Sequence, residues 1–150
     1  MRNKTNVNYE KIQYEIEGNK TKCYLTYYVD LTKWPMQGLT MDASTIVGIV
    51  TELGCTKIHF CPVTFMPIGA TFLVESTATC DTTTDTYDEE TGKHIALTRA
   101  QAKAFDKTLR LYAIIVNKID KIAEEVERFA ENNYSAYKKC RKHAAKLGGY

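Results

Sequence analysis

Cys55, His59 and Cys61 are the residues of this chain that most resemble a metal-binding set. Zinc prefers thiolate and imidazole ligands, and Cys80 or His94 would complete a tetrahedral set. The alternation of this segment predicts a strand with the three side chains on one face, where Cys55 and His59 would stand about 13 Å apart. No C-x-x-C or H-x-x-x-H spacing occurs in the chain. We therefore expect packed thiols, with no bound metal and no cofactor.

Catalytic arrangements are equally weak. The chain has no G-x-S-x-G nucleophile and no glycine-rich phosphate loop. A threonine-rich acidic run lacks the D-x-D-x-D-G pattern of a calcium loop; its carboxylates are Asp81, Asp85, Asp88, Glu89 and Glu90. We therefore predict that the protein is not an enzyme, and a small enzyme or metal-binding protein is the third alternative.

The C-terminal segment has the composition of a polyanion-binding surface. Between Asn133 and Tyr150 there are five basic residues and no acidic one. Basic side chains on one helix face beside aromatic rings suit phosphate contact and base stacking. The alternative is a solvated helix end, because cations also stabilise a helix C-terminus. The predicted binding residues of this segment are Lys138, Lys139, Arg141, Lys142, Lys146, Tyr134 and Tyr137.

A second basic group lies near residue 98. Lys93, His94 and Arg99 surround the expected start of the long helix, where free backbone N–H groups attract anions. We add Lys93 and Arg99 to the candidate contact residues. The acidic loop offers a rival contact surface that would face a basic protein groove; its residues are Asp85, Asp88, Glu89 and Glu90.

The elements that must position these residues are those of an α+β domain. Residues 9–30 alternate as a β-hairpin with a tight turn at Gly18-Asn19. A short helix follows at about 42–53, with Asp42 as N-cap and Gly54 after its end. Central strands are expected over 55–61 and 70–84. We predict an antiparallel sheet packed on a long C-terminal helix.

The long helix is expected to start at Thr98. "TRAQ" matches a capping box between Thr98 and Gln101, so "DEETGK" becomes a turn and "KHIAL" an extended lead-in. The helix either continues to about Leu147 or breaks near Asn132-Asn133. The organisation is therefore a single domain over 1–150, with a sheet-rich part at 1–97 and a long helix, continuous or broken, at 98–147.

Apolar residues of this helix repeat with alternating steps of four and three from Phe105 to Ala130. That spacing is typical of a coiled coil and predicts a homodimer. An additional flank of Ile115, Ile122 and Phe129 is expected to cover the protein's own sheet. The predicted oligomer interface consists of Leu109, Tyr112, Val116, Ile119, Ala123 and Val126.

The bulk composition fits one globular domain. The chain has 150 residues, is 44% hydrophobic and carries a formal charge of only +2. Five cysteines at irregular spacing favour reduced thiols in the cytoplasm. We see no segment with the composition of a signal peptide or of a membrane span, and we expect no membrane contact.

The stretch "CDTTTDTYDEETGKHIALTRAQAK" resembles a segment of small phage and prophage proteins of undefined function. The pattern is C-x-x-x-D-x-[FY]-D-x-x-x-G-x-x-[IL]-A-x-x-R-A, with one extra residue here after the cysteine. The order of strands and final helix is also loosely similar to double-stranded-RNA-binding domains. The matching residues are Cys80, Asp85, Tyr87, Asp88, Gly92, Ile95, Ala96, Arg99 and Ala100.

This resemblance implies a phage protein acting in the cytoplasm of a bacterial host. The leading interpretation is a non-enzymatic protein that binds a nucleic acid or a nucleic-acid-binding host protein. One concrete form would be an anti-CRISPR-like inhibitor of a host nuclease defence. The rival is a homo-oligomeric scaffold built on the heptad helix, in which the basic tail only improves solubility.

Overall fold

The computed structural model describes residues 7–32, 42–84 and 86–148, and the chain divides into two units. The first unit, Met1–Leu111, holds a sheet, a short helix and the first part of a long helix. The second unit, Tyr112–Tyr150, holds the remainder of that helix. The elements are β1 (Val7–Glu17), β2 (Lys20–Asp30), α1 (Ala43–Glu52), β3 (Lys57–Phe60), β4 (Pro67–Thr79) and α2 (Glu89–Lys146).

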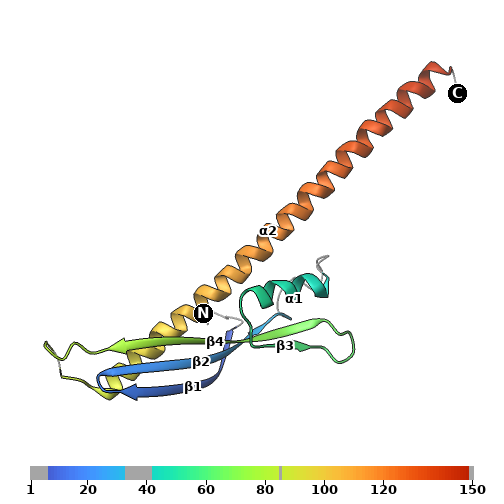
Figure 1. Cartoon of the computed structure of the whole chain (residues 1–150). Helices are drawn as coiled ribbons and strands as arrows, with labels where there is room; N and C mark the ends of the chain where they lie inside the picture. The colour runs from blue at the N-terminus through green and yellow to red at the C-terminus, as the bar shows by residue number, and fades with distance from the viewer. Residues whose placement is uncertain (1–6, 33–41, 85, 149–150) are drawn as a thin grey trace, which may run out of the picture. The chain divides into compact units, whose positions relative to one another are not determined.

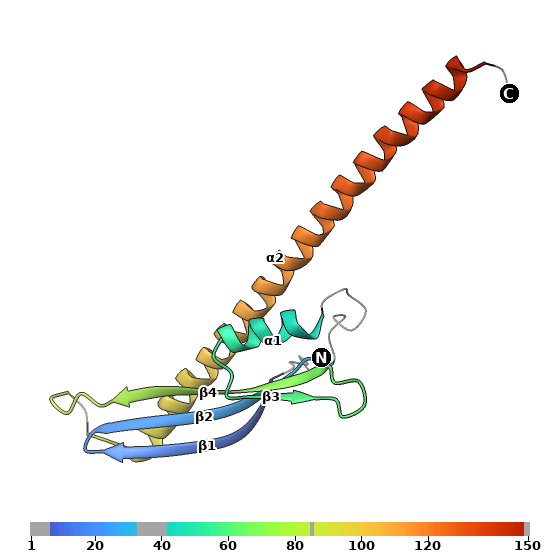
Figure 2. The ribbon, with the colours of Figure 1, turned by 45° about the vertical axis from the view of Figure 1, so that its right-hand side comes forward.

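The sheet has four antiparallel strands in the order β1-β2-β4-β3, so β1 and β3 form its edges (Figures 1 and 2). β1 and β2 form the predicted hairpin, and Gly18 in its turn has a φ of 60°. A positive φ is a conformation that glycine adopts without steric cost. The α+β class, the antiparallel sheet and both helices are thus confirmed.

The core of the first unit is a row of cross-strand pairs on one face of β2 and β4. Cys23, Leu25, Tyr27 and Val29 alternate inward along β2, and all are buried. Their partners on β4 are also buried, because directly opposed side chains share one face of a sheet. The pairs are Thr21–Ala78, Cys23–Ser76, Leu25–Val74, Tyr27–Phe72 and Val29–Ala70.

The short helix α1 has the predicted ends. Asp42 Oδ1 accepts a hydrogen bond from the backbone N–H of Thr45 at 2.8 Å, and Gly54 follows the helix with a φ of 81°. Ile46, Ile49 and Val50 are buried, and the helix packs against β4. Local sequence signals were sufficient for this element.

The predicted start of the long helix was wrong. α2 begins at Glu89, so "DEETGK" and "KHIAL" are not a turn and an extended lead-in but the first helical turns. Thr98 lies inside the helix, where its hydroxyl donates to the carbonyl of His94 at 2.9 Å. A threonine that bonds to the preceding turn in this way is not an N-cap. No capping box therefore forms between Thr98 and Gln101.

The face of α2 that packs in the first unit also differs from the prediction. The buried positions are small residues spaced by four, Ala96, Ala100 and Ala104, followed by Thr108 and Leu111. The larger Phe105 and Leu109, which the heptad pattern selected, are exposed instead. Small side chains let a helix backbone approach closely, so the buried face is not the most apolar one.

α2 is helical through residues 132 and 133 and continues to Lys146, so the predicted alternative of a break does not occur. The predicted flank behaves in two ways. Ile115 is buried, but Ile122 and Phe129 are exposed. The expectation that all three cover the sheet was therefore wrong for the last two.

Candidate functional site

The residues between β4 and α2 fasten the start of the helix to the sheet. The phenol oxygen of Tyr87 lies 2.9 Å from the hydroxyl of Thr21 on β2. Asp88 is the N-cap of α2, since its carboxylate accepts from the N–H of Glu90 at 3.3 Å and from the Thr91 hydroxyl. Glu89 and Glu90 occupy the first turn, where negative charge complements the helix dipole.

Gly92 permits the close approach of α2 to β2. A Cβ atom at this position would lie 2.7 Å from the Thr21 hydroxyl oxygen, closer than real Cβ contacts. One turn later the buried Ala96 and Ala100 continue the same face. Gly92, Ala96 and Ala100 therefore have a packing role in this protein.

Two cations of α2 cover a free stretch of sheet edge. β3 pairs with β4 only from Pro67 to Thr71, which leaves the following carbonyl groups of β4 without a strand partner on that side. The Arg99 guanidinium donates to Thr77 O at 2.9 Å, and the Lys103 ammonium donates to Glu75 O at 2.7 Å. Charged side chains at an exposed edge oppose pairing with another strand.

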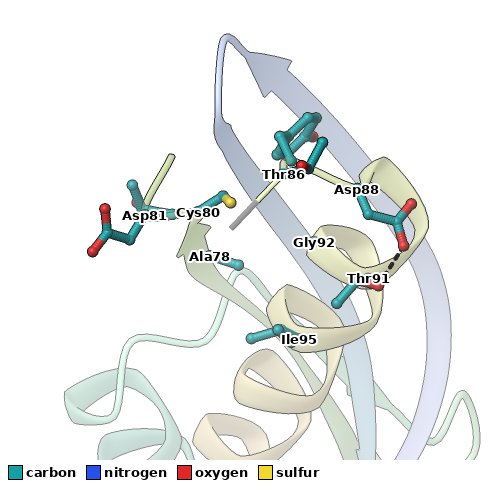
Figure 3. A pocket seen from close by; sticks show the side chains of 10 residues that line it. Ala78, Cys80, Asp81, Thr86, Asp88, Thr91, Gly92 and Ile95 are labelled. Atoms are coloured by element: carbon teal, nitrogen blue, oxygen red, sulfur yellow. Dashed lines mark hydrogen bonds between the residues drawn. The ribbon is translucent and has the colours of Figure 1, made fainter. Parts of the chain in front are cut away.

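A cavity of about 510 Å³ lies at this junction (Figure 3). Ala78 from β4 and Ile95 from α2 point into it, while Asp81 and Asp88 lie on its two sides. Both carboxylates are already used in local turns: Asp81 Oδ1 accepts from the N–H and the hydroxyl of Thr83. The hydrogen bonds from Thr83 lower the pKa of Asp81, and the one from Thr91 lowers the pKa of Asp88.

These hydrogen bonds limit what the acidic loop can do chemically. A carboxylate with a lowered pKa remains ionised and is a poor proton donor at neutral pH. Glu89 also forms an ion pair with Lys93 at 2.9 Å. Of the rival contact residues, Asp85 lies outside the described residues, Asp88 caps α2, and Glu90 is exposed.

The Cys55, His59 and Cys61 side chains do not form a cluster. Only His59 lies within β3; its Nε2 is 3.0 Å from the Thr71 hydroxyl, and its ring packs edge-on against Tyr28. A hydrogen bond from Thr64 lowers the pKa of Cys61. Within residues 7–32, 42–84 and 86–148, no group of three or more histidine, cysteine or acidic side chains is arranged to hold a metal ion.

The predicted cations divide between the two units. Lys93 and Arg99 belong to the first unit, and both are engaged: Lys93 pairs with Glu89 and lies 5.6 Å above the Tyr14 ring, and Arg99 bonds to β4. The remaining five lie in the second unit and are exposed. Among described residues none of these five forms an ion pair; they are Lys138, Lys139, Arg141, Lys142 and Lys146.

The aromatic residues of the second unit pack along the helix. The rings of Tyr134 and Tyr137 are stacked, with centroids 6.2 Å apart. Lys138 lies 4.6 Å from the Tyr134 ring, and Arg141 lies 5.8 Å from the Tyr137 ring and donates to its hydroxyl at 3.1 Å. The cations therefore cover aromatic faces that base stacking would require.

Sequence reasoning missed the residues that fasten α2 to the sheet. The signal was present as a small residue at every fourth position, Gly92, Ala96, Ala100 and Ala104, which places all of them on one helix face. The second set, Arg99 and Lys103, shares the same four-residue spacing. The β4 carbonyl groups that Arg99 and Lys103 contact could be identified only from the structure, because the sequence does not show that β3 ends its pairing with β4 at Thr71.

Beyond residue 111, none of the described side chains of the predicted dimer interface is fully buried. Val116 and Val126 are exposed, and Ile119 is half-buried. Among the helices of the described ranges, none combines the length and the apolar character needed to cross a membrane. Comparison with models of protein families, with curated proteins and with solved structures gave no match.

Proposed function

We propose that this protein is a non-enzymatic binding protein that contacts a nucleic acid, or a protein that holds one, through the basic segment of α2. The observation that carries the proposal is charge segregation: residues 133–148 contain five exposed cations and no acidic residue. Cations that are free of ion pairs can replace the counterions of a phosphate backbone, which makes binding favourable at low salt.

The lysines and the arginine are the contact groups in this proposal. Tyr134 and Tyr137 have a supporting role, because their rings hold Lys138 and Arg141 in place through cation–π contacts. The proposal differs here from the stacking role that the sequence suggests. A narrower role, an anti-CRISPR-like inhibitor in the cytoplasm of a bacterial host, rests on the phage-like pattern of residues 80–104 alone.

The test compares two variants with equal loss of charge. Lys138, Lys139, Arg141 and Lys142 are replaced by Ser in one, and the exposed Lys11, Lys20, Lys57 and Lys121 in the other. Binding to single-stranded and duplex oligonucleotides is measured by fluorescence anisotropy over a salt series. We expect the first variant to lose binding at low salt. For the duplex, the slope of log K against log salt concentration should become shallower by about 0.9 for each phosphate contact removed.

The control variant should retain both its affinity and its salt slope. Equal losses in the two variants would show that only net charge matters, and would overturn the assignment to the basic segment. Wild-type affinity in the first variant would overturn the proposal itself.

A further inference from the structure

The exposed apolar stripe of α2 extends beyond the segment in which the repeat was first apparent. After Ala130 the steps of four and three continue through Asn133, Tyr137, Cys140, Ala144 and Leu147. Val116, Val126, Tyr137 and Leu147 are 52%, 61%, 52% and 72% exposed. An unbroken helix with a stripe of this length is stable in water when a partner helix covers the stripe.

Charge along the same segment is divided into two blocks. Residues 120–131 contain five acidic side chains and two basic ones, whereas residues 133–148 contain five basic side chains and no acidic one. Two copies in parallel would place like charges side by side along both blocks. Two antiparallel copies would place each acidic block beside the partner's basic block. Opposite charges on adjacent helices attract each other.

Side-chain size favours the same orientation. In a parallel pair, identical residues meet, so Ala123, Ala130 and Ala144 would face their own copies and leave gaps, and Tyr137 would face Tyr137. In an antiparallel pair, a stripe residue that is followed by a step of three meets a residue of the partner that is followed by a step of four. Ala123, Ala130 and Ala144 are all followed by a step of three, so none of them meets another alanine.

We infer that a second copy of this chain pairs with α2 in antiparallel orientation over residues 116–147. The register that covers Val116, Val126, Tyr137 and Leu147 opposes Val116 to Leu147, Ile119 to Ala144, Ala123 to Cys140, Val126 to Tyr137 and Ala130 to Asn133. On the flanks, Phe129 meets Ala136 and Asp120 meets Arg141.

This pairing leaves the proposed contact surface accessible. Lys138, Lys139, Lys142 and Lys146 are off the stripe, on the outer side of the helix, and only Arg141 is adjacent to the seam. The inference goes beyond polyanion binding and does not depend on it. A dimer that binds no oligonucleotide, and a monomer that binds one, are distinguishable results.

The orientation can be tested in the full-length protein with Ala123→Cys. Within one helix, residues 123 and 140 are about 25 Å apart at 1.5 Å per residue, so a disulfide between them must join two copies. Under mild oxidation we expect a covalent dimer in which peptide mapping finds the introduced thiol of one copy bonded to Cys140 of the other. Homotypic bonds, which join the two introduced thiols to each other and Cys140 to Cys140, would indicate parallel pairing and overturn the inference.

Association without a crosslink provides a second test by sedimentation equilibrium. Val126→Asp should give a monomer, because the stripe loses a central apolar residue, while its fold by circular dichroism stays unchanged. Ser135→Asp adds the same charge on the outer side and should remain dimeric. The wild-type dimer should weaken several-fold as salt rises, since screening reduces attraction between the blocks. A wild-type monomer at high micromolar concentration, or a dimer that tightens with salt, would contradict the inference.

Discussion

Tyr27 lies in the middle of the buried face of the sheet, where its ring stacks on Phe72 with centroids 5.5 Å apart. Its hydroxyl is buried, and no residue in the described part of the chain hydrogen-bonds to it. Burial raises the pKa of Tyr27 well above the usual value, because the phenolate would be removed from water. The ring stabilises the core, whereas the oxygen carries an uncompensated desolvation cost.

Replacing Tyr27 by Phe should therefore stabilise the protein. We expect the free energy of unfolding to rise by about 1 kcal/mol, because an unpaired buried polar group is removed without a change of shape. Urea denaturation provides the measurement. Tyr28→Phe is the control, since the Tyr28 hydroxyl donates to Ile68 O at 3.3 Å and its loss should lower stability. A lower stability of Tyr27→Phe would show that the hydroxyl has a partner.

At the scale of elements, the start of α2 depends on a charged cap. Asp88 accepts hydrogen bonds from Glu90 and Thr91 at the point where four helical N–H groups lack partners within the helix. The hydrogen bond from Thr91, followed by that from the backbone, lowers the pKa of Asp88. Because the folded-state pKa is lowered, the contribution of Asp88 to stability is complete above about pH 4 and is lost as pH falls through the folded-state pKa.

Asp88→Asn should change the pH dependence of stability. Asn retains an acceptor for the cap but does not titrate, so the wild type should be the more stable protein at neutral pH. The difference in melting temperature should disappear as pH falls to about 2. Thermal melts over this range check the prediction. A difference that is constant with pH would mean that the cap contributes no charge-dependent stability.

At the scale of the whole molecule, the buried residues of the described chain end well before its C-terminus. Ile115 is the last of them, and every described side chain from Lys121 onward is exposed. No described side chain beyond Ile115 therefore adds to a buried core. Residues 116–148 carry instead the exposed basic residues and the apolar stripe on which the two proposals rest.

A chain shortened to end at Asn117 should therefore remain folded. Because it retains the whole buried core, its melting temperature should stay within about 5 °C of the full-length value. The same chain should be monomeric and should not bind oligonucleotides, because both proposed surfaces are removed. Differential scanning calorimetry and light scattering measure the two outcomes. Loss of cooperative unfolding would show that the distal helix is needed for the fold.

The sequence by itself determined the elements whose signals are local. The hairpin followed from strict alternation around Gly18-Asn19, and α1 followed from Asp42, its apolar positions and Gly54. Turn geometry, strand alternation and helix caps each depend on residues within a few positions of one another. These features were therefore recoverable without knowledge of the distant parts of the chain.

Tertiary structure decided where α2 begins and which of its faces is buried. Thr98 and Asp88 are both acceptable caps on local grounds, and the hydrogen bond between Tyr87 and Thr21 and the tight contact at Gly92 accompany the earlier start. Likewise, Ala96, Ala100 and Ala104 are buried in preference to larger apolar residues, because small side chains allow the helix backbone to approach the sheet closely. Which helix face is buried depends on the shape of the sheet surface opposite the helix. The spacing of apolar residues within the helix carries no information about that shape.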